Sequence, residues 1–293
     1  MGYTPLRMET PWPDRASSPS SGGAGSSVEE RFSFAKFAAH PFFKEVNTWL
    51  VARAGIRPGA DVVDLGCGPG AVTELILQNM GRPPLGRVFA VDPSGSALVQ
   101  AAQRIQSAVV RFIQGTAERV NSLVPPVDTV VFANAIHLVQ DKALVIASIS
   151  SVLRPGGILA FNTTFFNGAY ASDTHRFYRV WVLRAMRWLQ ERGHSVARGV
   201  KATARQWLSA DEYRHLLQVT GFSDTEMEFQ EKQLPVAAWE DISEFSMFIE
   251  GALPGVPLEV GAEALKVGVR QAFQELRLEA VPRIWLQAIA RRA

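Results

Sequence analysis

A glycine-rich turn between residues 62 and 75 carries the clearest chemistry of the chain. The segment reads VVDLGCGPGAVTEL, an apolar run that ends in Asp64 and passes through Gly66, Gly68 and Gly70 into a helical pattern. Glycine adopts backbone angles closed to other residues and has no Cβ, so a ligand can lie directly against the main chain. A carboxylate at the end of the preceding strand can receive an ammonium group or hydroxyls. The turn is therefore predicted to bind a small molecule.

The spacing alone also satisfies a dinucleotide fingerprint, in which Gly66, Gly68 and Ala71 would hold a pyrophosphate. Asp64 argues against that ligand, because its charge would repel a pyrophosphate and attract a cationic amino acid portion. The segment resembles the first signature of class I S-adenosylmethionine-dependent methyltransferases, an apolar strand followed by D-x-G-x-G-x-G. The resemblance implies that this turn binds S-adenosylmethionine through Asp64, Gly66, Cys67, Gly68 and Gly70.

Further motifs of the family follow in order. Residues 87–92 (RVFAVD) predict a second buried strand that ends in Asp92, the position where the family binds both ribose hydroxyls. Residues 109–115 predict a third strand, and Thr116 follows it where family members usually carry an acid near the adenine. Glu118 is expected to take over part of that role. Beyond the glycine turn, the resemblance implies cofactor contacts at Asp92, Pro93, Thr116, Ala117, Glu118, Asn134 and Ala135.

The remaining strands complete an α/β pattern. Residues 127–133 and 157–163 predict the fourth and fifth strands, the latter after an L-R-P-G-G turn that is common in the family. Alternation around Met227 and the run 284–290 predict the last two. The resemblance therefore implies a doubly wound, seven-stranded, mostly parallel sheet, the Rossmann-like methyltransferase fold, in a domain at residues 56–293.

Three regions outside the shared core are expected to select the substrate. Residues 28–55 resemble the helical lid segment that family members place over the cofactor, with Phe34 and Phe37 as ring contacts. Helical insertions are expected at about 165–206 and 238–279. Packing of the lid's rings into a core is an equally supported interpretation, and both can hold together. The expected substrate contacts are Phe34, Phe37, Tyr178 and Trp181.

The helix expected at residues 175–192 has an aromatic face with Tyr178 and Trp181 and an arginine-rich face opposite. Such a helix suits peripheral contact with a membrane interface or with an anionic, apolar substrate. Covering a core while solvating the arginines is the simpler interpretation. No segment resembles a membrane-spanning helix.

His137 is the candidate for acid–base chemistry, because it follows the strand end that faces the transferable methyl group in this fold. The ordinary pKa of histidine suits proton removal near neutral pH. A histidine that only shapes the pocket is the alternative. The end of the fourth strand offers no acidic pair for a metal, so no metal site is expected.

The composition of the chain limits the classes of protein and the cellular compartments that fit it. The 293 residues are 47% hydrophobic and carry a net charge of +2, which does not suggest a general nucleic-acid binder. Cys67 is the only cysteine, which excludes an intrachain disulfide framework and suits a reducing, cytoplasmic compartment. Residues 1–27 are rich in Pro, Ser and Gly and predict a disordered leader. Nothing in the sequence decides the oligomeric state.

These observations predict methyl transfer to an oxygen, carbon or nitrogen of a small, largely apolar or aromatic metabolite, as in secondary metabolism. No N/D-P-P-Y/F motif follows the fourth strand, unlike in most base-methylating enzymes. The alternative is an enzyme of the same fold that binds S-adenosylmethionine but catalyses a non-methylating cyclisation or elimination, because fold does not by itself establish a reaction.

Overall fold

The computed structural model describes residues 31, 32, 34–196 and 207–293. The predicted leader at 1–27 and the end of the first insertion, 197–206, lie outside the described residues. Within the described residues, one seven-stranded sheet has the order β3-β2-β1-β4-β5-β7-β6. The strands are β1 (Asp61–Leu65), β2 (Arg87–Asp92), β3 (Val110–Gln114), β4 (Val127–Ala133), β5 (Leu153–Thr163), β6 (Phe222–Pro235) and β7 (Ala280–Arg292).

The pairing confirms the predicted fold class. Strands β1 to β5 are paired in parallel, and β7 is antiparallel to both β5 and β6. β6 therefore runs in the same direction as the first five strands, and β7 alone runs against them. The sheet is mostly parallel, as expected, and its strand order reverses between β1 and β4.

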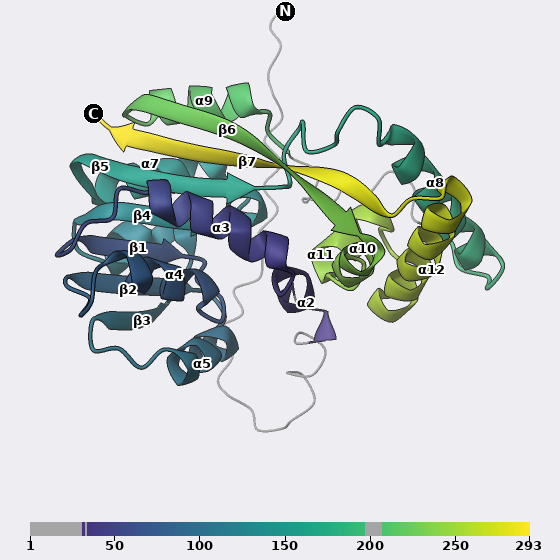
Figure 1. Cartoon of the computed structure of the whole chain (residues 1–293), viewed down its shortest axis with the longest axis horizontal. Coiled ribbons are helices and arrows are strands. Elements are labelled where there is room, and N and C mark those ends of the chain that lie inside the picture. The colour runs from purple at the N-terminus through teal and green to yellow at the C-terminus, as the bar shows by residue number, and fades with distance from the viewer. Residues whose placement is uncertain (1–30, 33, 197–206) are drawn as a thin grey trace, which may run out of the picture.

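Helices cover both faces of the sheet (Figure 1). All five residues of β1 are buried because successive side chains point to opposite faces and both faces are packed. Val62 packs with α3 (Pro41–Arg53) and α4 (Ala71–Asn79), whereas Val63 packs with α7 (Lys142–Val152) and α9 (Ala210–Val219). The short elements α5 (Gly95–Arg104), η1 (Ala117–Arg119), α6 (Val120–Leu123) and η2 (Ile136–Leu138) follow the ends of β2, β3 and β4.

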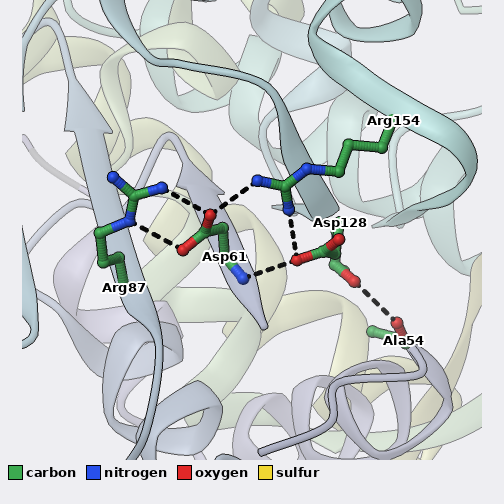
Figure 2. Close-up of polar contacts among 6 residues, drawn as sticks. Ala54, Asp61, Arg87, Asp128 and Arg154 are labelled. Atoms are coloured by element: carbon green, nitrogen blue, oxygen red, sulfur yellow. Dashed lines mark hydrogen bonds and ion pairs between the residues drawn. The ribbon is translucent and has the colours of Figure 1, made fainter. Parts of the chain in front are cut away.

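Ion pairs lock the amino-terminal ends of four strands (Figure 2). Asp61 accepts two hydrogen bonds from Arg87, at 2.8 and 2.6 Å, and one from Arg154 at 2.9 Å. Arg154 also pairs with Asp128 at 2.6 Å, and the Asp61 N–H donates to the same carboxylate at 2.8 Å. These contacts join β1, β2, β4 and β5 at the edge opposite to the carboxyl ends of the parallel strands.

The fifth strand begins earlier than the sequence indicates. It was expected from residue 157, but β5 begins at Leu153 because that residue already pairs with Val127. Thr129 then pairs with Ile158, so the L-R-P-G-G segment bulges out of the ladder between the two pairs. The bulge carries Arg154 to Asp61.

A second core lies beside the sheet, where β6 and β7 extend past the other strands (Figure 1). The inserted helices pack together there. Gly268 in the helix at residues 258–276 allows close approach to the helix at residues 175–190, since a Cβ at position 268 would lie 2.8 Å from the Ala185 nitrogen and the Trp181 carbonyl oxygen. Phe37 is buried in the same core, as the packing interpretation of the lid requires. The helices are α2 (Ala35–Ala38), α8 (His175–Gln190), α10 (Val236–Ile242), α11 (Ser246–Ala252) and α12 (Leu258–Leu276).

Candidate functional site

Three glycines between β1 and α4 share a positive φ but serve different purposes. Gly66, Gly68 and Gly70 have φ of 69°, 51° and 89°. A Cβ on Gly66 would stand 3.0 Å from the Cβ of Ala135, and one on Gly70 would stand 2.7 Å from Ile105. No atom lies within 4 Å of the Cβ position of Gly68. The middle glycine therefore leaves open space against the main chain, which is the space a bound molecule would use.

Asp64 is a buried carboxylate that lacks a full set of partners. Its Oδ2 accepts a hydrogen bond from the Thr73 hydroxyl at 2.6 Å, whereas its Oδ1 has no partner among the described residues. Burial raises the pKa of Asp64 to about 7, the Thr73 hydrogen bond opposes the rise, and the charge of Asp92 adds to it. A buried oxygen without a partner costs free energy that a cationic ligand would recover.

Asp92 ends β2 beside the glycine turn. One of its oxygens accepts from the Gly68 N–H at 2.8 Å, and the other accepts from the Ser94 N–H at 2.8 Å. A carboxylate offers about four lone-pair positions, so two donors leave room for hydroxyl groups. The same contact fixes Asp92 against the open side of the turn. The two carboxylates expected from the sequence are thus on adjacent strands of the same crevice.

The other residues expected at the cofactor follow the same strand ends. Cys67 is buried, and burial raises the pKa of its thiol well above the usual range, so it is an inert residue of the turn. Pro93 and Thr116 are exposed, whereas Ala117 and Glu118 are partly buried in η1. Ala135 packs against Gly66 and keeps the loop after β4 close to the turn.

Asn134 has its side chain committed to the fold. Its backbone is left-handed, with φ of 51°, and its amide nitrogen donates to Asn47 at 3.0 Å. Its amide oxygen accepts from the Trp285 indole N–H at 2.9 Å, and its backbone N–H donates to Asn162. This buried network joins α3, β4, β5 and β7.

A cavity of about 630 Å³ opens beyond the ends of β4 and β5. Its lining is mostly aromatic or aliphatic and includes no aspartate or glutamate. The lining comes from the loop after β4, the segment after β5, α8, α11 and α12. It comprises His137, Leu138, Phe165, Asn167, Tyr170, His175, Tyr178, Trp181, Val182, Trp207, Phe245, Met247, Phe248, Gly251, Ala252 and Leu265.

The structure separates the four residues expected at the substrate. Tyr178 and Trp181 line the cavity, whereas Phe34 and Phe37 are not part of its lining. Phe34 packs edge-on against Phe245, with ring centroids 5.1 Å apart, so it supports the lining from behind. Phe37 stacks on Trp285 in the second core. The N-terminal segment thus touches the cavity wall through a second layer of rings.

His137 lines the cavity with a defined ring orientation. Its Nδ1 lies 3.1 Å from the Thr163 hydroxyl, and that hydroxyl accepts the Phe165 N–H at 3.0 Å. Because the buried hydroxyl already accepts a hydrogen bond, its own hydrogen is available for Nδ1. A neutral ring then carries its hydrogen on Nε2. Burial, together with the positive charges of Lys142 and Arg283, lowers the pKa of His137 to about 3.

Several cavity residues were missed by the sequence reasoning. Phe165, Tyr170 and Trp207 carry no motif, and they come together from two separate segments, one directly after β5 and one shortly before α9. Arg283 packs against these rings from β7, although the last strand was expected to begin one residue later. The P-R-I-W alternation of that strand was the available signal for Arg283.

The described residues include no group of three or more His, Cys, Asp or Glu that could hold a metal ion. In the same residues, no helix is long and apolar enough to cross a membrane. Helix α8 buries Phe177, Trp181, Ala185 and Leu189, so its aromatic face covers a core.

Comparisons with known proteins agree with this architecture. Residues 62–157 match a family described as a methyltransferase domain. The chain is 37% identical over 131 residues to a trans-aconitate 2-methyltransferase of Azoarcus sp. (strain BH72), covering 44% of this chain and 48% of that protein. A relative of the same name from Deinococcus radiodurans is 30% identical over 169 residues, covering 57% and 60%. The chain thus spans about half the length of the relatives it matches.

Solved structures share the fold at low identity. The YcgJ protein of Bacillus subtilis is 18% identical with a TM-score of 0.53, covering 85% of this chain and 98% of its own. The phosphoethanolamine N-methyltransferase 2 of Haemonchus contortus, solved with S-adenosylhomocysteine, is 16% identical with a TM-score of 0.53, covering 91% and 57%. Together with the glycine turn and the sheet order, the match of residues 62–157 to a methyltransferase domain confirms that the chain resembles the class I S-adenosylmethionine-dependent methyltransferases.

Proposed function

We propose that the chain catalyses methyl transfer from S-adenosylmethionine to a small molecule held in the cavity beyond β4 and β5. The observation that carries the proposal is the unpartnered Oδ1 of buried Asp64 next to the open face of Gly68. An ammonium group would satisfy that oxygen, and the flat main chain would accept the body of the ligand. The names of the relatives and the solved complex with S-adenosylhomocysteine support the same ligand.

Each group has an assigned task in this proposal. S-adenosylmethionine supplies an electrophilic methyl carbon, which forms a bond to the acceptor as its bond to sulfur breaks and the electron pair stays on sulfur. Asp64 holds the amino acid portion, and Asp92 accepts hydrogen bonds from the ribose hydroxyls. The aromatic cavity excludes water and aligns the acceptor, which supplies much of the acceleration in a displacement of this kind.

His137 orients the acceptor in this proposal. A neutral imidazole whose pKa lies at about 3 is a poor proton acceptor near pH 7, whereas its Nε2–H is able to donate a hydrogen bond to a ligand in the cavity that His137 lines. This geometry favours the pocket interpretation of His137 over the general base. The acceptor's proton then leaves by water or is absent from the nucleophilic atom.

The acceptor is proposed to be small and largely apolar or aromatic. The cavity volume of about 630 Å³ and its ring-lined walls support this choice. The relatives are named for trans-aconitate, a carboxylate substrate, and that compound belongs in any panel of acceptors. A cytoplasmic enzyme of secondary metabolism fits the single buried cysteine and the apolar cavity.

We further propose that residues 28–55 and the inserted helices act together as a lid. The backbone N–H of Ser246 donates to the Phe32 carbonyl at 3.0 Å, and His40 contacts Asp241 at 2.8 Å. Lys36 also pairs with Glu244. Helices α2 and α3 are therefore tied to α10 and α11, so movement of one segment would move the other.

Isothermal titration calorimetry with S-adenosylmethionine and S-adenosylhomocysteine tests the site. We expect the wild-type protein to bind both, and Gly68→Ala to bind at least about tenfold more weakly because a side chain would fill the open face. Gly156→Ala is the matched control, since Gly156 also has a positive φ, 74°, and no atom within 4 Å of its Cβ position, but lies at the opposite edge of the sheet. Stronger binding of NAD or NADP would overturn the proposal.

The reaction is tested with S-adenosylmethionine labelled in its methyl group and a panel of small acceptors. We expect labelled product whose mass is increased by one methyl unit. A product formed without label from a substrate that requires the bound cofactor would instead establish the cyclisation or elimination alternative.

A further inference from the structure

Arg283 is a buried cation in the extension of β7, with 3% of its surface exposed. Its Nε donates to the Thr164 hydroxyl at 3.0 Å, and Nη2 donates to the Thr164 carbonyl at 2.6 Å. Nη1 donates to the Tyr178 hydroxyl at 3.2 Å. Every oxygen in these hydrogen bonds is uncharged. Among the described residues, no carboxylate forms an ion pair with Arg283.

The guanidinium lies directly behind the lining of the cavity, to which Arg283 itself does not belong. It is 4.6 Å from the ring centroid of Tyr170, 5.6 Å from that of Phe165 and 5.7 Å from that of Trp207. These three residues and Tyr178 all line the cavity. Cation–π contacts offset part of the cost of burying the charge but do not neutralise it.

Other groups give the same region a positive character. The positive charges of Lys142 and Arg283 both lower the pKa of His137. His175 also lines the cavity, and it lies at the start of α8, the end of the helix that carries partial positive charge. The lining contains no acid to balance them. A buried charge without a counter-charge is costly to the fold, and a ligand that brings the opposite charge recovers the cost.

We propose that Arg283 and Tyr178 form an anion subsite that binds one carboxylate of an otherwise apolar acceptor. The inference rests on the proposed function, because it assigns this cavity to the acceptor. The Tyr178 hydroxyl lines the cavity, accepts a hydrogen bond from Arg283 and keeps its own hydrogen to donate to a carboxylate, while the guanidinium behind it supplies the opposite charge. A single buried arginine balances one negative charge, which favours a monocarboxylate over a phosphate dianion. Arg283 thereby determines specificity and takes no part in breaking bonds.

The test compares two probes of the same shape, 3-phenylpropanoate and 3-phenylpropanamide, on the wild-type protein saturated with S-adenosylhomocysteine. Calorimetry should show the carboxylate binding at least about tenfold more tightly than the amide, the order expected for a charge-assisted pair. Equal binding, or preference for the amide, would overturn the inference. This comparison needs no variant, so it stands even if substitutions at Arg283 impair folding.

Variants then locate the preference. Arg283→Gln should reduce the carboxylate-to-amide ratio to about one, and Arg283→Lys should retain part of it. Arg184→Gln removes the same charge from α8 at a residue that pairs with Glu275 of α12 and is not part of the cavity lining, and this variant should keep the wild-type ratio. If Arg283→Gln folds and keeps the full preference, Arg283 is a structural cation only.

Failure of this inference is distinguishable from failure of the proposed function. If the wild-type protein does not bind S-adenosylhomocysteine, the proposed cofactor site is contradicted before any probe is added. Intact cofactor binding with methyl transfer confined to neutral acceptors would leave the proposed function standing and exclude the carboxylate subsite.

Discussion

At the scale of single residues, the site is defined by groups that the fold leaves unsatisfied. Asp64 has a buried oxygen with no partner among the described residues, and the Gly68 face is open. Asn134, although adjacent in sequence to the cavity, has its amide fully engaged within the buried network. The residues proposed to bind a ligand, Asp64 and Gly68, are thus distinct from those, such as Asn134, whose side chains hold the strand ends together.

The raised pKa of Asp64 gives a pH test of the cofactor site. Because the carboxyl has a pKa of about 7 in the folded protein, it becomes protonated below pH 7 and loses its attraction for an ammonium group. Affinity for S-adenosylhomocysteine should fall by about tenfold for each pH unit between 7 and 5. Calorimetry in matched buffers measures this slope.

The same titration needs two variants. Asp64→Asn should bind weakly and without the slope, because the amide does not titrate. Glu74→Gln changes an acid that pairs with Arg104 on the surface of α4 and should keep the wild-type slope. A wild-type affinity that is constant from pH 5 to 7 would contradict the assignment of Asp64.

His137 is tested by the difference between hydrogen bonding and proton removal. Since its pKa is lowered to about 3 and its Nδ1 is occupied by Thr163, we expect His137→Gln to retain most of the turnover and His137→Ala to lose about tenfold. No limb near pH 6 to 7 should arise from this residue in the pH profile. His215→Gln on the exposed face of α9 is the control. A loss of about 10²-fold in His137→Gln would restore the general base.

At the scale of elements, the sequence predicted what short-range patterns encode. Strands β2 and β4 have the bounds expected, and the glycine turn follows β1 as its motif requires. The early start of β5 was missed because a Pro-Gly-Gly segment indicates a turn, while pairing of Leu153 with Val127 depends on a neighbouring strand. The extension of β7 beyond its expected start depends likewise on its long partner, β6.

The cavity was harder to predict than the glycine turn for the same reason. Much of its wall comes from helices α8, α11 and α12, which are separate in the sequence and come together only in the folded protein. The amphipathic pattern of α8 predicted that Tyr178 and Trp181 contact the substrate. It does not predict which aromatic side chains of the N-terminal segment reach the cavity. Phe34 instead packs behind Phe245 of the lining, and Phe37 stacks on Trp285 in the second core.

Gly268 tests the pairing of α8 and α12. A Cβ at this position would lie 2.8 Å from two backbone atoms of α8, which cannot move aside as a flexible side chain can. Gly268→Ala should therefore lower the free energy of unfolding by roughly 1–3 kcal/mol, despite the better helix propensity of alanine. Urea denaturation measures the change. Binding of S-adenosylhomocysteine by the folded fraction should persist, because the glycine turn is built on other elements.

Gly95→Ala is the control for Gly268→Ala. Gly95 begins α5, and its nearest atoms would lie 3.5 Å from a new Cβ, an ordinary contact. Stability should stay the same or rise by up to about 1 kcal/mol. Equal stability of Gly268→Ala and the wild-type protein would show that the two helices are not held at the distance described.

At the scale of the whole molecule, the two ends of the parallel strands have opposite tasks. The amino-terminal ends are held together by a chain of ion pairs, in which Arg87 and Arg154 both pair with Asp61 and Arg154 also pairs with Asp128 (Figure 2). The opposite edge carries Asp64, Asp92 and Arg283, none of which forms an ion pair within the part of the chain that the structure describes, with the second core beside them. This division places rigidity at one edge and ligand binding at the other, so loss of the lock should change stability without changing the site.

Asp61 provides the test of that division through its acid titration. Its hydrogen bond with Arg87, aided by Arg154, holds the pKa of Asp61 at about 2 against an ordinary 3.8. The contribution of this carboxylate to the free energy of unfolding is therefore complete above about pH 4 and disappears as Asp61 is protonated in the folded protein near pH 2.

Asp61→Asn should lower the free energy of unfolding at pH 7 by about 1 kcal/mol, a modest value because both arginines are partly exposed to solvent. The difference from wild type should shrink between pH 4 and 2. Asp211→Asn changes an exposed acid that pairs with Arg214 on the same helix and should show no such difference, and affinity for S-adenosylhomocysteine should be unchanged in both variants. If Asp61→Asn weakened cofactor binding as much as Asp64→Asn, the two edges of the sheet would be coupled and the division would be wrong.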